Sequence, residues 1–343
     1  MLRTSFEAAV ALHDVLVPRI HRLTINKFKE RLPLRKDFAL TVGLTEFQRK
    51  TYDLYTSFLN LDMADSGKAV WYYMHVEFIS YICTHPLLFY MHFPKSKILR
   101  RILAHEPRPA VHLEAVQPDV EQAFFDLLCS VPDMTSTSLS NRILIVEKIV
   151  EESIKVGDKV FIITDSLETM DLVQHLLHVQ GRSVWCFTDA MPAANTPQHV
   201  TYTEADVYIS WPGGCHAYMY TTRANRVIIL ESTREHCFQD WAINQLHCLG
   251  QQKPLYVYRF MASETFEEIL FYRKVFSVDL LHRIVDDLVT PRRIPLEWVY
   301  PNLHPQTIPG DEPSELRGQD AILDRIMEGD YSITGIRKID LQI

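Results

Sequence analysis

The chain has 343 residues, 47 % of them hydrophobic, with 35 basic and 43 acidic side chains that give a formal charge of −8. This length suggests two or three domains with ordinary cores. The negative charge excludes a surface that attracts polyanions everywhere, so any nucleic-acid contact must come from local basic patches. The six cysteines include no CxxC pair and match no zinc template, which is typical of reduced thiols in the cytosol or nucleus; no metal is expected.

The first 130 residues are expected to be mainly helical. Helices are expected over 5–31, 46–59, 69–83 and 119–129, with a strand over 38–42. The stretch from Ala69 to Phe93 is apolar and long enough to span a membrane. Its aromatic composition and the break at Thr84-His85-Pro86 instead favour a buried helix, so no membrane partner is expected. His85 is expected to be a buried or turn histidine.

Seven basic residues lie between positions 19 and 36, against Glu30 as the one acid. They are Arg19, Arg22, Lys27, Lys29, Arg31, Arg35 and Lys36. Such a stripe is either a solvated helix face or a contact with a phosphate backbone, which needs only Lys and Arg. Both interpretations stay open, and Arg19, Arg22, Lys27 and Lys29 are the nucleic-acid-binding candidates.

Strands and helices alternate after a Ser-, Thr- and Pro-rich boundary at 131–140. The expected helices are 141–156, 166–179, 238–248 and 265–276, and the expected strands are 159–164, 183–187, 206–210, 226–231 and 254–260. This order predicts an α/β fold with a parallel sheet and helices on both faces. Ligands of such sheets bind at the carboxyl ends of strands, here at the loops that begin at Thr164, Ser210 and Glu231.

A Pro-rich connector follows Leu288, and one helix is expected near 319–328. The expected division is therefore a mainly helical segment (1–130), an α/β lobe (131–290) and a Pro-rich brace with a tail (291–343).

Several short motifs occur in a fixed order along the chain. They are Leu44-Thr45-x-x-Gln48, Cys83-Thr84-His85-Pro86, Gly157-Asp158-Lys159-Val160-Phe161, Ser210-x-x-Gly213-Gly214, Ala224-Asn225-Arg226, Gly250-Gln251-x-Lys253-Pro254 and the segment 254–286. Their order and spacing resemble the second RecA-like lobe of Swi/Snf-type chromatin remodellers, with the ATRX-like branch nearest. The resemblance covers roughly residues 5–290, and 1–130 resembles the end of the first lobe with the inter-lobe segment.

The resemblance implies a family in which two lobes close around ATP and Mg²⁺ and move along duplex DNA. It therefore implies duplex DNA, nucleosomes and chromatin-associated proteins as partners, and the nucleus as the location. It also implies that Thr164, Ser166, Ser210, Gly213 and Gly214 lie where the family contacts DNA. Asp165 and Ser166 are equally well explained as a helix cap.

The chain departs from the family at the ATP site. It has no G-x-x-x-x-G-K-[ST] phosphate loop, and Gln245 and Cys248 stand where the family has two arginines. An arginine that contacts the transferring phosphate is worth ~10³–10⁵ in rate, and neither replacement is charged. Gly250 and Gln251 are the remnant of that site, and Trp241 replaces the family's Gln. We therefore expect that the chain has lost the binding of ATP and Mg²⁺. We do not expect it to hydrolyse ATP.

Three hypotheses follow from these observations. The chain is a catalytically degenerate scaffold that binds DNA or a chromatin complex, a part of an ATP-dependent DNA translocase, or a protein-interaction module without a nucleic-acid role.

Overall fold

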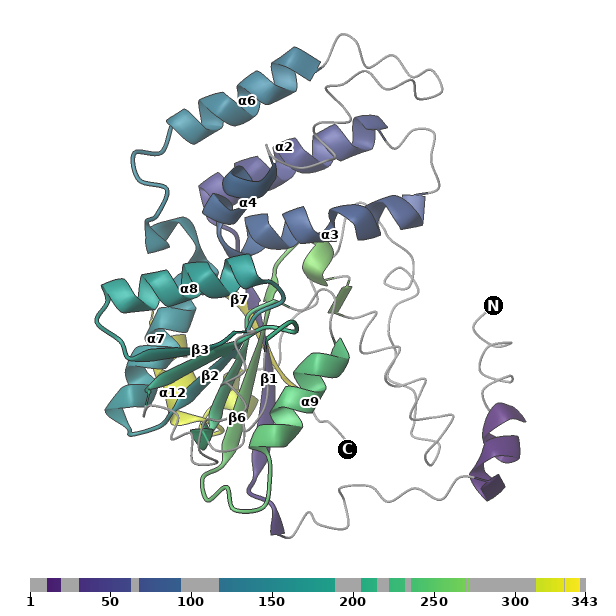
Figure 1. Cartoon of the computed structure of the whole chain (residues 1–343), viewed down its shortest axis with the longest axis vertical. Helices are drawn as coiled ribbons and strands as arrows, with labels where there is room; N and C mark the ends of the chain where they lie inside the picture. The colour runs from purple at the N-terminus through teal and green to yellow at the C-terminus, as the bar shows by residue number, and fades with distance from the viewer. Residues whose placement is uncertain are drawn as a thin grey trace, which may run out of the picture.

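The computed structural model contains one seven-stranded sheet (Figure 1). It describes residues 11–19, 31–62, 68–93, 117–188, 205–214, 222–231, 236–268, 270–271, 313–329 and 331–339. The strands are β1 (Arg35–Val42), β2 (Val160–Ile163), β3 (Val184–Phe187), β4 (Val207–Ser210), β5 (Arg226–Ile229), β6 (Leu255–Ala262) and β7 (Ile333–Ile339). Their order is β3-β4-β2-β5-β6-β1-β7, and every pairing is parallel except that of β7 with β1.

The central strands are apolar throughout because both of their faces are buried. Successive residues of β2 point into two different cores: Val160 and Ile162 into one, Phe161 and Ile163 into the other. A strand covered on both faces loses the apolar–polar alternation of a half-exposed strand, which is why these segments read as continuous apolar runs.

Helices cover both faces of the sheet. One core contains apolar residues of α7 (Asn141–Lys155), α8 (Leu167–Val179) and α12 (Ala321–Met327), and the other contains those of α9 (His236–Leu246). The predicted fold class, an α/β protein with a parallel sheet and helices on both faces, is thereby confirmed, with β7 as the one antiparallel addition.

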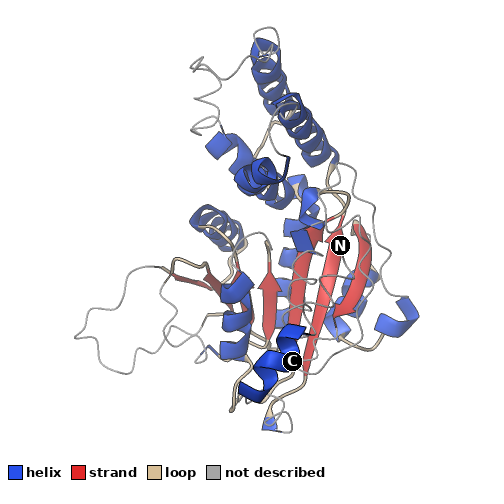
Figure 2. Cartoon of the chain, turned by 90° about the vertical axis from the view of Figure 1, so that its right-hand side faces the viewer, coloured by secondary structure: helices blue, strands red, loops and turns tan. Residues whose placement is uncertain are grey.

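A group of helices, called the helical layer below, gathers at one end of the sheet (Figures 1 and 2). It consists of α2 (Glu46–Asp62), α3 (Lys68–Thr84), α4 (Pro86–His92) and α6 (Gln117–Cys129). Its core is aromatic: the ring of Phe89 lies 5.3 Å from that of Tyr55, 4.8 Å from that of Phe93 and 5.4 Å from that of Phe124. No helix in the described part of the chain has the length and apolarity needed to cross a bilayer.

The break at Thr84-His85-Pro86 separates two helices. The sequence predicted the end of α3 but not α4, which begins at Pro86, a residue suited to the first helical position. His85 is buried and caps α4, with its Nδ1 accepting from the backbone N–H of Leu87 at 3.3 Å and its Nε2 lying 3.2 Å from the carbonyl oxygen of Ser136. The expectation of a turn histidine is confirmed, and burial lowers the pKa of His85.

Strands from all three expected segments meet in the one sheet. β1 comes from 1–130 and β7 from 291–343, yet β1 lies between β6 and β7. The boundaries proposed at 130/131 and 290/291 thus separate segments of the chain whose strands all belong to the same sheet. The remaining described elements are η1 (Val17–Arg19), η4 (Thr137–Leu139) and α11 (Pro313–Leu316).

Two expected helices are described only in part. Residues 11–16 of the expected helix 5–31 are helical, as are 266–268 and 270–271 of the expected helix 265–276. Residues 17–19 form η1, residues 31 and 265 are described but are not α-helical, and the other residues of these two segments lie outside the described part.

Candidate functional site

The carboxyl ends of β2, β4 and β5 meet at one edge of the sheet, which is called the carboxyl edge below. The backbone N–H of Thr164 donates to the carbonyl oxygen of Ser210 at 3.0 Å, and that of Leu230 donates to Ile163 at 3.0 Å. The loops after β2, β4 and β5, which were predicted as ligand-binding loops, therefore start side by side.

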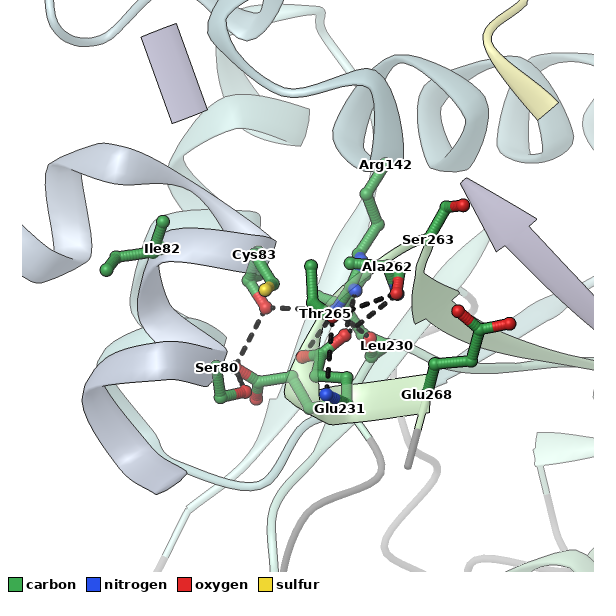
Figure 3. A network of polar contacts seen from close by, with 12 residues as sticks. Ser80, Ile82, Cys83, Arg142, Leu230, Glu231, Ala262, Ser263, Thr265 and Glu268 are labelled. Carbon is green, nitrogen blue, oxygen red and sulfur yellow. Dashed lines mark hydrogen bonds and ion pairs between the residues drawn. The ribbon is translucent and has the colours of Figure 1, made fainter. Parts of the chain in front are cut away.

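A single buried carboxylate, that of Glu231, organises this edge (Figure 3). Its Oε1 accepts hydrogen bonds from the hydroxyls of Ser80 at 3.3 Å, Thr84 at 3.1 Å and Thr169 at 3.0 Å. Its Oε2 accepts from the backbone N–H of Asp165 at 2.9 Å. The donors belong to α3, to α8 and to the loop between β2 and α8, so one side chain joins the helical layer to the sheet.

The environment of Glu231 favours its neutral form. Burial raises the pKa of Glu231 to about 7, and the negative charge of Asp165 acts in the same direction. The N–H of Asp165, the hydroxyl of Thr169 and the charge of Arg142 oppose that rise. The carboxyl group therefore changes its charge near neutral pH.

An ion pair lies beside this carboxylate. Arg142, at the start of α7, is 2 % exposed and pairs with Glu267 through Nη2. Its Nη1 donates to the carbonyl oxygen of Leu230 at 2.9 Å and to the hydroxyl of Thr84 at 3.2 Å. Glu267 also accepts from the backbone N–H of Ala262 at 3.0 Å. A buried pair of this kind persists only when its remaining hydrogen-bonding groups are satisfied, as most are here.

The Arg142–Glu267 ion pair was not expected from the sequence. The one available signal was Arg142 itself, a charged residue next to the apolar run Ile143-Leu144-Ile145-Val146. Its partner is 125 positions away, so no local pattern connects the two.

The loop after β2 holds two of the predicted DNA-facing residues. Thr164 is buried, and its hydroxyl donates to the carbonyl oxygen of Ser166 at 3.1 Å. Ser166 is the N-cap of α8, since its Oγ accepts from the N–H of Thr169 at 3.1 Å. The cap interpretation holds for Ser166 and is wrong for Asp165, which lies one residue before the cap and whose carboxylate accepts a hydrogen bond from Gln239.

The loop after β4 needs its two glycines for packing. A Cβ on Gly213 would lie 2.2 Å from the indole ring of Trp211, and one on Gly214 would lie 2.3 Å from the carbonyl oxygen of Phe187. Ser210 is buried at the start of this loop. Close packing thus explains both glycines without a ligand.

Gly250 and Gln251, the expected remnant of an ATP site, lie at the opposite, amino edge of the sheet. Gln251 Nε2 donates to the carbonyl oxygen of Ala224, just before β5, at 3.0 Å. Lys253 Nζ donates to Asp158 Oδ1, just before β2, at 2.8 Å. Gly250 has φ = +100°, a backbone conformation that side-chain-bearing residues rarely adopt. The candidate residues of the ATP site and those of the DNA contact therefore lie at opposite edges of the sheet.

Helix α9 connects the two edges, because its 11 residues span about 16 Å. At its first turns Gln239 donates to the carbonyl oxygen of Glu231 at 2.9 Å and to Asp165 at 3.2 Å. At its other end lie Gln245 and, just beyond the helix, Cys248, both half-buried.

The other buried arginines are paired within the protein. Arg226 contacts Asp158 at 2.8 Å and Asp320 at 3.0 Å. Arg259 lies 3.5 Å from Asp37 and 3.3 Å from Asp240. Both guanidinium groups therefore brace the fold.

The basic stripe is described only at its ends. Arg19 is exposed and bonds to the carbonyl oxygen of Val15, whereas Arg22, Lys27 and Lys29 lie outside the described residues. Among the described residues, no group of three or more His, Cys, Asp and Glu side chains could hold a metal ion.

The mostly parallel sheet, covered on both faces and carrying its polar loops at strand ends, has the architecture of a RecA-like helicase lobe. No known protein-family profile matches the chain. The chain is 26 % identical over 188 residues to a transcriptional regulator ATRX homolog of Caenorhabditis elegans. The aligned region covers 45 % of this chain and 14 % of that protein.

Two further relatives cover more of the chain. The Helicase ARIP4 of Xenopus tropicalis is 21 % identical over 344 residues, 81 % of this chain and 24 % of that protein. The DNA repair and recombination protein RAD26 of Saccharomyces cerevisiae is 21 % identical over 296 residues, 83 % of this chain and 24 % of that protein. These relatives confirm the resemblance to Swi/Snf-type ATPases, and the chain spans about a quarter or less of their length.

Solved structures of the same kind are similar at a lower level. The C-terminal part of the Fun30 ATPase domain has a TM-score of 0.46 and 15 % identity, covering 80 % of this chain and 95 % of that one. The Sulfolobus solfataricus SWI2/SNF2 ATPase core in complex with dsDNA has a TM-score of 0.45 and 16 % identity, covering 82 % and 56 %.

Proposed function

We propose that this chain is a catalytically degenerate relative of the Swi/Snf-type remodellers. It acts in the nucleus as a scaffold that binds duplex DNA or a chromatin complex, and it does not hydrolyse ATP.

The observation that carries the proposal is the state of the arginines. Gln245 and Cys248 occupy the positions at which the family places its phosphate-contacting arginines. Arg142, Arg226 and Arg259 are each 5 % exposed or less and already pair with carboxylates. None of these three guanidinium groups is available to stabilise charge on a transferring phosphate.

The DNA-binding half of the proposal rests on the carboxyl edge and the basic stripe. Thr164, Ser166 and Ser210 come together at that edge, although their hydroxyls also have structural roles. The basic stripe supplies the charges that a phosphate backbone requires. Relatives named for DNA repair and for transcriptional regulation support a chromatin setting.

Hydrolysis is tested by measuring phosphate release from ATP and Mg²⁺ with the purified chain, with and without duplex DNA. We expect no turnover from the chain or from the Gln245→Arg/Cys248→Arg variant, because the sequence has no phosphate loop. Turnover by the unmodified chain would overturn the proposal, and turnover by the double variant alone would show that the absent phosphate loop is not what prevents hydrolysis.

DNA binding is tested by fluorescence anisotropy of a labelled duplex at several salt concentrations. We expect the logarithm of the binding constant to fall linearly with the logarithm of salt, with the slope reduced by ~1 for each of Lys27→Gln and Lys29→Gln. Lys253→Gln is the matched control, because Lys253 is held by Asp158 and Gly157 at the amino edge. If the chain does not bind DNA even at low salt, the DNA-binding proposal is wrong, and the hypothesis of a protein-interaction module without a nucleic-acid role remains.

A second candidate is part of an ATP-dependent DNA translocase. It is favoured by the greater length of the relatives, of which the chain spans at most about a quarter. DNA-stimulated ATP turnover by this chain mixed with a first RecA-like lobe would support it.

A further inference from the structure

The contacts of Glu231 cross the boundary between the helical layer and the sheet. Ser80 and Thr84 belong to α3, whereas Glu231 follows β5. The same boundary is bridged by Arg142, which donates to the Thr84 hydroxyl, and by Ser140, whose Oγ donates to the Thr84 carbonyl oxygen at 2.6 Å. Helix α3 is therefore attached to the sheet through polar groups that converge on one carboxylate.

The groups around Glu231 differ in charge. Its three hydroxyl partners and Gln239 of α9 are neutral. Asp165, from the loop before α8, is the acidic neighbour, and Arg142, from α7, is the basic one. The charge of Arg142 is already balanced by Glu267, which follows β6. Among the described residues, an ionised Glu231 thus has Arg142 as its basic neighbour but no ion pair of its own.

We propose that the Glu231 carboxyl group is a proton-operated latch that fixes α3, and with it the helical layer, on the carboxyl edge of the sheet. When the group takes up a proton from solvent, Glu231 adds no charge to the junction beyond the Arg142–Glu267 pair, and α3 is held closely. When the proton leaves, the carboxylate charge is buried next to Asp165 and the junction loosens.

The direction follows from linkage. The pKa of Glu231 is about 7 when α3 is docked, whereas the ordinary value is 4.5. A group whose pKa is higher in the closed state stabilises that state at low pH, and the stabilisation is lost as the pH rises through the higher value. Between pH 6 and pH 8 the equilibrium for opening of α3 should increase about tenfold.

The test is hydrogen–deuterium exchange of the full chain at pH 6 and pH 8, corrected for the intrinsic pH dependence of exchange. We expect the corrected exchange of amides in α3 to rise about tenfold in the wild type. In Glu231→Gln, a neutral side chain of the same shape, we expect no comparable rise. An equal rise in both proteins, or none in the wild type, would overturn the latch.

The matched control is Glu152→Gln. Glu152 is also buried, but hydrogen bonds from Lys155, Lys148 and Arg325 hold its pKa at about 2, so it stays charged over this range. This variant should show the same rise in α3 as the wild type.

A second measurement covers the case in which Glu231→Gln fails to fold. The carboxyl carbon signals of ¹³C-glutamate-labelled wild type are followed from pH 4 to pH 9. A glutamate with a midpoint near 7 supports the latch, and a set in which no glutamate has a midpoint near 7 overturns it.

Discussion

The two edges of the sheet hold their buried charges in different ways. At the amino edge Arg226, Asp158, Lys253 and Asp320 form ion pairs in which each charge faces an opposite one. At the carboxyl edge Glu231 is surrounded mainly by hydroxyls and a backbone N–H. The amino edge is therefore fixed over the physiological pH range, whereas the carboxyl edge, where the helical layer docks, responds to pH.

The difference also bears on function. The amino edge holds the Gly250-Gln251 turn, and the end of α9 beside it carries the uncharged residues Gln245 and Cys248. In the proposed function, the architecture is preserved where it supports the sheet, and the charged chemistry is lost where it would serve ATP. This contrast is what the proposed scaffold function predicts.

The largest effect is expected from Arg142→Met. The substitution leaves the carboxylate of Glu267 buried without its partner, which should lower the free energy of unfolding by about 3–5 kcal/mol. The double variant Arg142→Met/Glu267→Gln should recover part of that loss, because no uncompensated charge remains. Urea denaturation measures both, and a double variant less stable than the single one would show that the pair is not the reason for the loss.

A smaller effect is expected from Gly214→Ala at the carboxyl edge. The added methyl group would lie 2.3 Å from the backbone oxygen of Phe187, so the loop must move at a cost of about 1–3 kcal/mol. Gly43→Ala is the control, because its methyl group would lie 3.5 Å from the nearest atom, an ordinary contact. Equal thermal stabilities of the two variants would contradict the packing explanation.

The smallest effect concerns pH and compares the two edges directly. From pH 6 to pH 8 the wild type should lose about 1.4 kcal/mol of stability relative to Glu231→Gln, since the raised pKa of Glu231 stabilises the fold only at lower pH. Asp158→Asn should differ from the wild type by a constant amount over the same range. Burial alone would raise the pKa of Asp158, but bonds from Lys253 and Arg226 lower it, so its contribution is lost only in acid.

Denaturation curves at pH 6, 7 and 8 give the stabilities of the wild type, Glu231→Gln and Asp158→Asn. A pH-dependent difference for Asp158→Asn, or a constant one for Glu231→Gln, would remove the distinction between the two edges.

Much of the fold could be predicted from local patterns. The runs at 159–164 and 206–210 are predicted as strands because both faces of β2 and β4 are apolar, and the helix predicted over 141–156 is present as α7. β7 was missed because Ile333–Ile339 contains Gly335 and two basic residues and is stabilised by β1, nearly 300 positions earlier. α4 was not predicted because Pro86 was taken to end the preceding helix, whereas it is the first residue of α4.

The sequence alone determined the α/β order and the family resemblance, and it supplies the uncharged Gln245 and Cys248 on which the proposed loss of ATP chemistry rests, because these depend on residue identity and short spacing. Only the tertiary structure decided that Arg142 pairs with Glu267, that the candidate sites lie at opposite edges, and that Glu231 joins the helical layer to the sheet. Those features depend on burial and on contacts between distant segments, which set the cost of each charge and have no signature in the local sequence.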